Sequence, residues 1–293
     1  MMQTTLDEHK QQETAISEEN LTAFLRYLHE SEKAPATISK YEREVRKLMR
    51  FLDGKAPKRE HLILYRDSLK QEKGARSVNA SLSAVNAYLQ FQGMQDRKLH
   101  LLRVQRSNFV EEQRELSEEE YRKLLHAARM EGNERLWLLL QTVCSSGIRI
   151  SELPFITVEA AGRRWAEISM KGKERRVLLQ QKLCEQLLRY ARKESIETGS
   201  IFLTCHGNPM NRSNIWQEMK RLCRLAGVDE KKGYPHNLRH LFARSFYQIE
   251  KDLAHLADIL GHSSIETTRI YVAQSMKESE KLLCRMQLLE RME

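Results

Sequence analysis

The second half of the chain contains six residues whose types suit the transfer of a phosphoryl group to a side chain. They are two arginines, two histidines, a lysine and a tyrosine: Arg149, Lys171, His236, Arg239, His262 and Tyr271. Arginine presents a planar, permanently charged fork that matches the oxygens of a phosphate. Imidazole can move a proton near neutrality, a lysine ammonium can donate one, and a tyrosine hydroxyl can act as a nucleophile. Together these groups could move a phosphodiester onto a tyrosine.

Two short motifs hold three of these residues. Arg149 follows a glycine in SSGIRISEL, and HNLRH places His236 and Arg239 three residues apart, so that both reach one face of a helix. Each motif alone has an ordinary explanation. An arginine after a glycine usually caps a helix or lies at the surface, and a histidine–arginine pair on a helix usually makes surface ion pairs. Their joint occurrence with the residues below favours a catalytic site.

The motif LADILGHSSIETTRIYV predicts two helices joined by a tight corner. Gly261 should end the first helix, and Ser263 with Glu266 three residues later forms a capping box for the second. His262 then lies in the corner, and Tyr271 lies about two turns along the second helix. A tyrosine in a helix usually packs in a core, so Tyr271 is a candidate nucleophile only because of these neighbours.

A β-hairpin is expected where the helical period stops. Its strands are Trp165–Met170 and Arg175–Leu179, and its turn contains Lys171-Gly172-Lys173. A lysine in a turn is normally just solvated. A lysine at a hairpin tip can also protonate a leaving oxygen as a general acid. Lys171 is the candidate for that role, and Lys173 is its rival.

Helical patterns fill the rest of the chain. The first domain is expected to have four helices, over Leu21–Leu28, Tyr41–Leu52, His61–Leu69 and Ser77–Phe91. Ser17 should start the first helix, and Thr37 or Ser39 should cap the second. Gly54 should end the second helix and Gly93 the fourth. The charged stretch Leu101–Arg114 has no clean period and predicts a linker. The second domain opens at Leu116 with a capping box of Ser117 and Glu120, continues with an apolar helix over Leu136–Val143, and becomes helical again from Gln181. The expected fold is therefore mainly α, with a small helical domain followed by a helical domain that holds one small hairpin sheet.

These patterns give the expected domain organisation. We expect a disordered tail over 1–16, a helical domain over 17–104, a linker over 105–115 and a catalytic domain over 116–293 whose C-terminal helix spans 275–293. No apolar run is long enough to span a bilayer, and the polar, acidic N-terminus lacks the layout of a signal peptide. A cytoplasmic location is expected.

Cysteine usage and charge point to a partner rather than to a cofactor. The five cysteines stand singly, and the Cys205-His206 pair has no second pair to complete a metal site, so neither metal nor cofactor is expected. Residues 33–106 carry seventeen Lys and Arg against seven Asp and Glu, whereas residues 1–32 carry two against seven. This local excess of positive charge favours a polyanion such as DNA. The candidate DNA-binding residues are Lys40, Arg43, Lys47, Arg76 and Asn79.

Taken together, the motifs resemble the signature of the tyrosine recombinases, which include the Xer-type resolvases and the phage and transposon integrases. SGIRISEL resembles the first family box, HNLRHLFA the second and LGHSSIETTRIY the third, and KGKERRVLL resembles the hairpin that carries the family's lysine. The resemblance covers residues 17–100, which are similar to the helical, SAM-like core-binding domain, and residues 116–293, which are similar to the catalytic domain. The chain is closest in size to the simple Xer-type enzymes.

The resemblance implies a site-specific recombinase that cleaves and rejoins DNA through a covalent 3′-phosphotyrosyl link at Tyr271. It also implies double-stranded DNA with an inverted-repeat core site as partner, and a tetramer on that DNA linked by the C-terminal helix. The apolar stripe Leu282, Met286 and Leu289 would dock that helix on a neighbouring protomer, or else on its own domain. A type IB topoisomerase and a non-catalytic DNA-binding protein are the alternatives. The chain departs from the family pattern in a hairpin turn that is one residue shorter and in the stretch PFITVEAAGRRWAEI after the first box.

Overall fold

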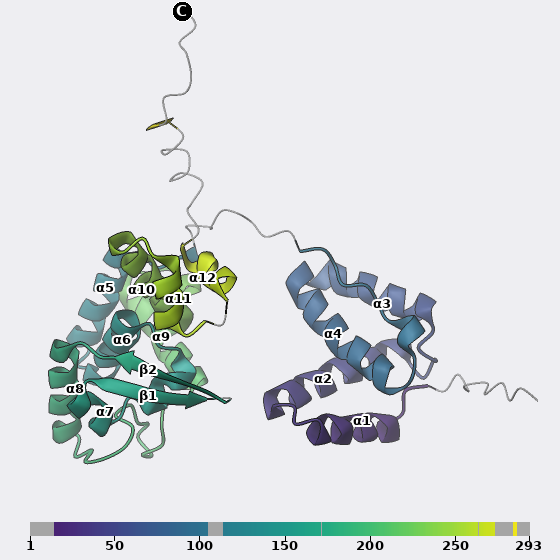
Figure 1. Ribbon diagram of the computed structural model, residues 1–293, viewed down its shortest axis with the longest axis horizontal. Coiled ribbons are helices and arrows are strands. Elements are labelled where there is room, and N and C mark those ends of the chain that lie inside the picture. Colours follow the sequence, from purple (N-terminus) through teal and green to yellow (C-terminus); the bar gives the residue numbers. More distant parts are fainter. Residues whose placement is uncertain (1–14, 105–113, 171, 263, 273–283, 286–293) are drawn as a thin grey trace, which may run out of the picture. The chain divides into compact units, whose positions relative to one another are not determined.

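The computed structural model describes residues 15–104, 114–170, 172–262, 264–272 and 284–285. The chain divides into two compact units, Met1–Arg106 and Ser107–Glu293 (Figure 1). Residues 1–14 of the expected tail, residues 105–113 of the expected linker and nearly all of the expected C-terminal helix over 275–293 lie outside the described residues. Lys171, the candidate general acid, also lies outside them.

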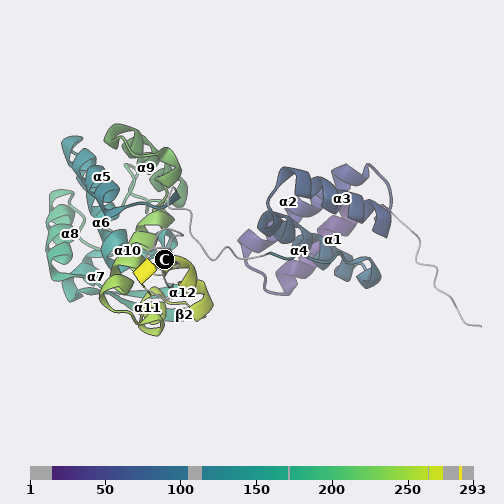
Figure 2. The ribbon, with the colours of Figure 1, turned by 90° about the horizontal axis from the view of Figure 1, so that it is seen from above.

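The first unit is all-helical in its described part, as the sequence predicts. Its four helices are α1 (Glu18–Glu30), α2 (Pro35–Leu52), α3 (Arg59–Glu72) and α4 (Ala75–Phe91), followed by the short 3-10 helix η1 (Gln95–Arg97) (Figure 2). The predicted cap of α1 is confirmed, because the Ser17 hydroxyl accepts a hydrogen bond from the Asn20 N–H at 3.1 Å. The predicted start of α2 at Thr37 or Ser39 is wrong. The helix begins at Pro35, whose fixed φ suits a first helical position and whose missing N–H needs no partner there.

Two asparagines of α4 hold the chain that follows the helix. The Asn79 amide donates to the Leu102 carbonyl at 2.9 Å and accepts from the Leu102 N–H at 2.7 Å. Asn86, two turns further along α4, holds Leu99 in the same way at 2.8 and 2.9 Å. Leu102 therefore still belongs to the first unit, and the linker starts further along the chain than the charged stretch from Leu101 predicts.

The second unit is mainly helical with one small sheet in its described part. Its elements are α5 (Glu118–Met130), α6 (Glu134–Ser146), η3 (Ile150–Phe155), α7 (Val158–Arg163), β1 (Trp165–Met170), β2 (Lys173–Leu178), α8 (Gln181–Lys193), α9 (Arg212–Ala226), η4 (Glu230–Lys232), α10 (Pro235–Ile249), α11 (Leu253–Leu260) and α12 (Ile265–Val272) (Figure 1). The apolar helix α6 packs against α5, α8 and α10, and the predicted capping box of Ser117 and Glu120 opens α5. The core is therefore built around a helix that the sequence predicts to be strongly apolar.

The strands β1 and β2 form an antiparallel hairpin beside α7. Met170 pairs with Lys173, so the turn between them has two residues, and Gly172 adopts the left-handed conformation that such a turn requires (φ 70°). The predicted start of the second strand at Arg175 is wrong, because pairing continues to Lys173. The strand begins with four charged residues, so its sequence shows no alternation of apolar and polar residues from which this start could be predicted.

Candidate active site

The second unit brings five of the six candidate residues together from three segments. Arg149 follows the end of α6, His236 and Arg239 lie on α10, and His262 and Tyr271 come from the α11–α12 corner. The predicted end of α11 is confirmed, because Gly261 follows the helix in the left-handed conformation (φ 64°). The predicted cap Ser263 lies outside the described residues. Segments more than 100 residues apart in sequence thus form one cationic cluster.

Arg239 is the buried centre of this cluster, with an exposed fraction of 1%. Its guanidinium donates to the Gly147 carbonyl and, at 2.7 Å, to the Leu260 carbonyl. These carbonyls close α6 and α11, where helices have unpaired acceptors and partial negative charge. Burial and the nearby Arg149 charge lower the pKa of Arg239 to about 10, so the side chain stays charged at neutral pH.

Gly147 lets the end of α6 approach α10 closely. It adopts a left-handed φ of 65°, and a Cβ atom there would lie 2.4 Å from the Phe242 ring. A larger residue would therefore push the Gly147 carbonyl away from Arg239. The glycine of SSGIRISEL is a packing requirement of the site as well as a helix stop.

His262 is held in one tautomer by its two partners. Its Nε2 lies 2.9 Å from Arg239 Nη2, and because arginine can only donate, Nε2 must be the acceptor. The proton of the neutral ring therefore sits on Nδ1, which donates to the Thr268 hydroxyl at 2.8 Å. Burial and then the charges of Arg239 and Arg149 lower the pKa of His262 to about 4, which keeps the ring neutral near pH 7.

Tyr271 is buried among three histidine rings. Its hydroxyl lies 3.1 Å from His236 Nε2, a hydrogen-bond distance. The His240 ring packs over the Tyr271 ring at a centroid distance of 4.4 Å, and the His262 ring lies at 5.3 Å. Desolvation and the neighbouring arginine charges lower the pKa of His236, so this ring is neutral and able to accept a proton at neutral pH.

Arg149 is fixed by a buried carboxylate. Glu152 accepts from the Arg149 backbone N–H and from its Nη1, both at 2.8 Å, and from Arg175 Nη2 at 2.7 Å. Burial alone would raise the pKa of the Glu152 carboxyl, but these N–H donors and the Arg175 charge hold it below its usual range. The Arg149 side chain is 38% exposed, so it keeps an accessible face for an incoming anion.

The sequence reading missed four residues of this site. Glu152 and Arg175 hold Arg149, Thr268 sets the tautomer of His262, and His240 packs on Tyr271. Some signals were present in the quoted motifs, since Glu152 lies three residues after Arg149 and Thr268 lies one helical turn before Tyr271. The partners across elements, Arg175 with Glu152 above all, had no sequence signal.

The candidate DNA-binding residues of the first unit fall into two groups. Arg43 and Arg76 are exposed, and Lys40 and Lys47 are half-exposed. Arg43 and Lys47 both contact the buried carboxylate of Glu44, at 3.3 and 3.4 Å. Asn79 differs, because both ends of its amide hold the Leu102 backbone. Asn79 therefore stabilises the fold of the first unit, and a contact of this residue with DNA stays a prediction.

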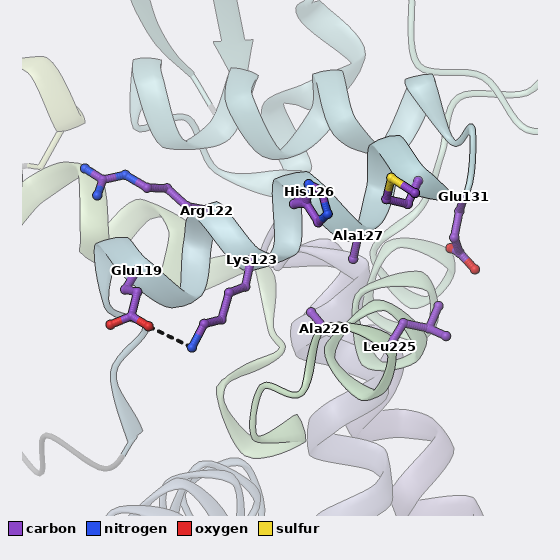
Figure 3. A pocket seen from close by; sticks show the side chains of 9 residues that line it. Glu119, Arg122, Lys123, His126, Ala127, Glu131, Leu225 and Ala226 are labelled. Atoms are coloured by element: carbon purple, nitrogen blue, oxygen red, sulfur yellow. Dashed lines mark ion pairs between the residues drawn. The ribbon is translucent and has the colours of Figure 1, made fainter.

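A separate hollow of about 620 Å³ lies between α5 and the end of α9 (Figure 3). Apolar side chains of Met130 and Leu225 line it, and a Glu119–Lys123 ion pair closes one side. None of the five clustered candidate residues lines this hollow. It is a surface feature distinct from the active site.

Metal-binding clusters and membrane-spanning helices are absent from the part of the chain that the structure describes. Within those residues, no group of three or more His, Cys, Asp or Glu side chains could hold a metal ion, and Cys205 is exposed. Among the described helices, none is long and apolar enough to cross a membrane.

Comparison with known proteins decides the family. The model of the phage integrase family matches residues 114–278, more than half of the chain, and the N-terminal SAM-like domain of phage integrases matches residues 21–96. The chain belongs to the phage integrase family. Its architecture is that of a SAM-like core-binding domain followed by an integrase catalytic domain, as predicted.

Curated relatives give the activity. Tyrosine recombinase XerA of Pyrococcus furiosus is 26% identical over 287 residues, which cover 95% of this chain and 97% of the relative. Tyrosine recombinase XerD of Staphylococcus saprophyticus is 32% identical over 154 residues, 49% of this chain and 52% of the relative. The protein is a tyrosine recombinase that cleaves and rejoins DNA. The comparisons favour this activity over the topoisomerase and non-catalytic alternatives.

Solved structures share the fold. XerH recombinase bound to its difH substrate matches with a TM-score of 0.68 and 18% identity, covering 93% of this chain and 86% of that chain. A lambda integrase dimer bound to a COC′ core site matches with a TM-score of 0.70 and 15% identity, covering 96% and 81%.

Proposed function

We propose that Tyr271 is the nucleophile of the recombinase and that His236 takes its proton. The observation that carries this proposal is the 3.1 Å approach of the Tyr271 hydroxyl to Nε2 of a histidine whose pKa is lowered. A neutral imidazole at this distance can accept the phenolic proton as the oxygen attacks phosphorus. The surrounding arginine charges favour the developing phenolate as well.

Arg149 and Arg239 are proposed to hold the two non-bridging oxygens of the scissile phosphate. Negative charge grows on those oxygens in the transition state, and permanently charged donors fixed beforehand stabilise it without reorganisation. Arg239 is fixed by carbonyls at two helix ends, and Arg149 by Glu152. His262 orients the Arg239 guanidinium.

The leaving group needs a proton of its own. The bond from Tyr271 Oη to phosphorus forms as the bond from phosphorus to the 5′-oxygen breaks, and that oxygen takes a proton from a lysine ammonium. Lys171 is the proposed donor and Lys173 its rival, because Lys171 precedes Gly172 between the two strands and Lys173 is the first residue of β2. A 5′-hydroxyl from the partner strand reverses these steps, so neither nucleotide nor other cofactor is consumed.

Replacement of the nucleophile tests this assignment. Tyr271→Phe removes only the hydroxyl, and we expect normal folding and DNA binding but no covalent adduct on a nicked suicide substrate. Tyr234→Phe is the matched control, since Tyr234 lies just before α10 and should leave adduct formation unchanged. An adduct with Tyr271→Phe on a denaturing gel, or its loss with Tyr234→Phe, would contradict the proposal.

We also propose how the chain binds its site. Residues 17–104 would form the core-binding domain and residues 116–293 the catalytic domain, with Lys40, Arg43, Lys47 and Arg76 contacting DNA phosphates. The excess of basic residues over 33–106 supports this proposal. The DNA would carry inverted repeats, one for each protomer of a pair, and the enzyme would act in the cytoplasm. Affinity should then fall steeply with salt, and a flat response in a gel-shift titration would contradict this clamp.

Four protomers are proposed to assemble on the DNA through the C-terminal segment 275–293. The apolar stripe Leu282, Met286 and Leu289 supports docking on a neighbouring protomer, and a lambda integrase tetramer bound to a Holliday junction shares the fold of this chain. A chain truncated after Gln274 should keep its melting temperature and its half-site binding but lose cooperative binding to the full site. A large drop in melting temperature with cooperativity retained would instead place the segment on its own domain.

A further inference from the structure

Arg175 is a residue of the hairpin that reaches into the catalytic cluster. Its side chain, 16% exposed, leaves the third position of β2 and spans two other segments. Nη1 donates to the Ile259 carbonyl in the last turn of α11 at 2.6 Å, and Nη2 donates to Glu152 at 2.7 Å. One side chain thus joins the hairpin to the helix before His262 and to the carboxylate that holds Arg149.

Gly261 keeps room for this bridge. A Cβ atom at Gly261 would lie 2.5 Å from Cδ and 2.8 Å from Nε of Arg175. The corner that presents His262 is therefore packed directly on the Arg175 side chain. A change in the position of Arg175 would therefore displace both the hairpin and the corner.

The bridge also sets the charge beside the phosphate site. Glu152 carries one negative charge and contacts two positive ones, Arg149 and Arg175. The three groups have a net charge of one positive, whereas Glu152 with Arg149 alone would be neutral. Arg175 therefore leaves the positive charge of Arg149 available to an incoming phosphate.

We propose that Arg175 is a positioning residue, which fixes the hairpin that carries the lysine relative to the phosphate-binding Arg149. This inference rests on the proposed general-acid role of the turn lysine. Arg175 lies two residues beyond Lys173, about 7 Å along the strand at the usual rise, so its anchor on α11 holds the start of β2 in place. Loss of the anchor would leave the leaving oxygen without a well-placed proton donor.

Arg175→Lys separates the two effects of the residue. Lysine keeps the positive charge near Glu152. It lacks the planar fork that donates to Glu152 and to the Ile259 carbonyl at the same time. The matched control is Arg176→Lys, the same change one position along β2, where Arg176 instead stacks over Trp165 at 4.6 Å. Arg175→Gln removes charge and fork together.

The test compares two suicide substrates, one with the natural 5′-oxygen and one with sulfur at the same bridging position. A thiolate leaves without protonation, so cleavage of the sulfur substrate does not need the general acid, which typically contributes about 10² to 10⁴-fold. We expect Arg175→Lys to cleave the oxygen substrate about 100-fold more slowly and the sulfur substrate within about threefold of the parent rate. Arg176→Lys should match the parent on both, and Arg175→Gln should be slow on both.

The ratio of the two rates decides the outcome, because a partly unfolded preparation lowers both rates equally and leaves the ratio unchanged. Equal losses of Arg175→Lys on the two substrates would overturn the inference. Lys171→Ala and Lys173→Ala test the proposed function separately. If one of them shows the sulfur rescue and Arg175→Lys does not, the general acid stands and the role of Arg175 fails. If Arg175→Lys alone shows rescue, Arg175 positions a different proton donor.

Discussion

Thr268→Val removes a single hydroxyl from the active site while nearly preserving the shape of the side chain. Thr268 is completely buried on α12, and its hydroxyl accepts the Nδ1 proton of His262 at 2.8 Å. Without this acceptor, the Nδ1–H has no partner. The alternative tautomer would turn the Nε2–H toward Arg239 Nη2, which is also a donor. Either result loses an interaction that the folded state needs.

The size of the effect follows from the burial of the two groups. A buried donor left without a partner costs about 1 to 3 kcal/mol. His262 is only half-buried, so water can compensate in part, and we place the loss in the unfolding free energy at about 1 to 2 kcal/mol. For a unit of this size, that corresponds to a melting temperature lower by roughly 2 to 8 °C. We expect the single-turnover cleavage rate to fall at least about tenfold, because complete removal of one preorganised donor typically costs about 10² to 10³.

Two matched variants make the prediction sharp. Thr267→Val is the same change at the neighbouring, exposed position, and it should leave stability and cleavage nearly unchanged. Thr268→Ser keeps the hydroxyl and loses a methyl group, so it should cleave at close to the parent rate. Thermal melts and cleavage of a suicide substrate measure both quantities. If Thr268→Val behaves like Thr267→Val, or if Thr268→Ser cleaves as poorly as Thr268→Val, the tautomer argument is refuted.

Three further predictions follow from the same site. Gly147→Ala should lower both stability and cleavage more than Gly132→Ala, because both glycines have a φ near 65° but only Gly147 has a neighbour, Phe242, in the way; equal melting temperatures would contradict this. In the folded state the pKa values of His240 and His262 are about 4, against the usual 6.5, so between these pH values the unfolded chain binds more protons than the folded one. The free energy of unfolding should therefore fall as the pH drops from 6.5 toward 4. A constant melting temperature over that range would speak against these pKa values. Cleavage and rejoining should proceed in EDTA, because two arginines supply the charge for the phosphate; loss of cleavage that magnesium restores would disprove it.

The motifs of the chain were sufficient to predict candidate residues that lie together in the structure, but not the contacts among them. Arg149, His236, Arg239, His262 and Tyr271 were identified from residue type and local spacing, and the structure brings them together. Helical spacing fixes only neighbours within one element, such as His236 and Arg239. Which nitrogen of His262 carries the proton depends on Arg239, 23 residues earlier in the chain, so no local pattern could predict it.

For the fold as well, the sequence predicted which elements form but not where each of them begins. Strong apolar periodicity located the four helices of the first unit, but the start of α2 at Pro35 and the start of β2 at Lys173 were missed. Both errors lie at element ends, which local sequence preference defines only to within a few residues. Asn79 was a candidate DNA-binding residue. In the structure its amide holds the Leu102 backbone, a pairing across 23 residues.

The sequence by itself determined the residue types that can do the chemistry, the order of the elements and the local excess of positive charge over 33–106, because each of these depends on composition or on near neighbours. Only the tertiary structure decided that the carbonyls closing α6 and α11 hold Arg239, that Glu152 divides its charge between two arginines, and that Arg175 ties the hairpin to the corner of His262. Apart from the Arg149–Glu152 pair, whose members are three residues apart, these contacts join segments separated by 21 to 92 residues in the sequence. Many tertiary arrangements would be compatible with the local sequence patterns of these segments. The close packing of the core selects one of them, and with it the partners of each buried polar group.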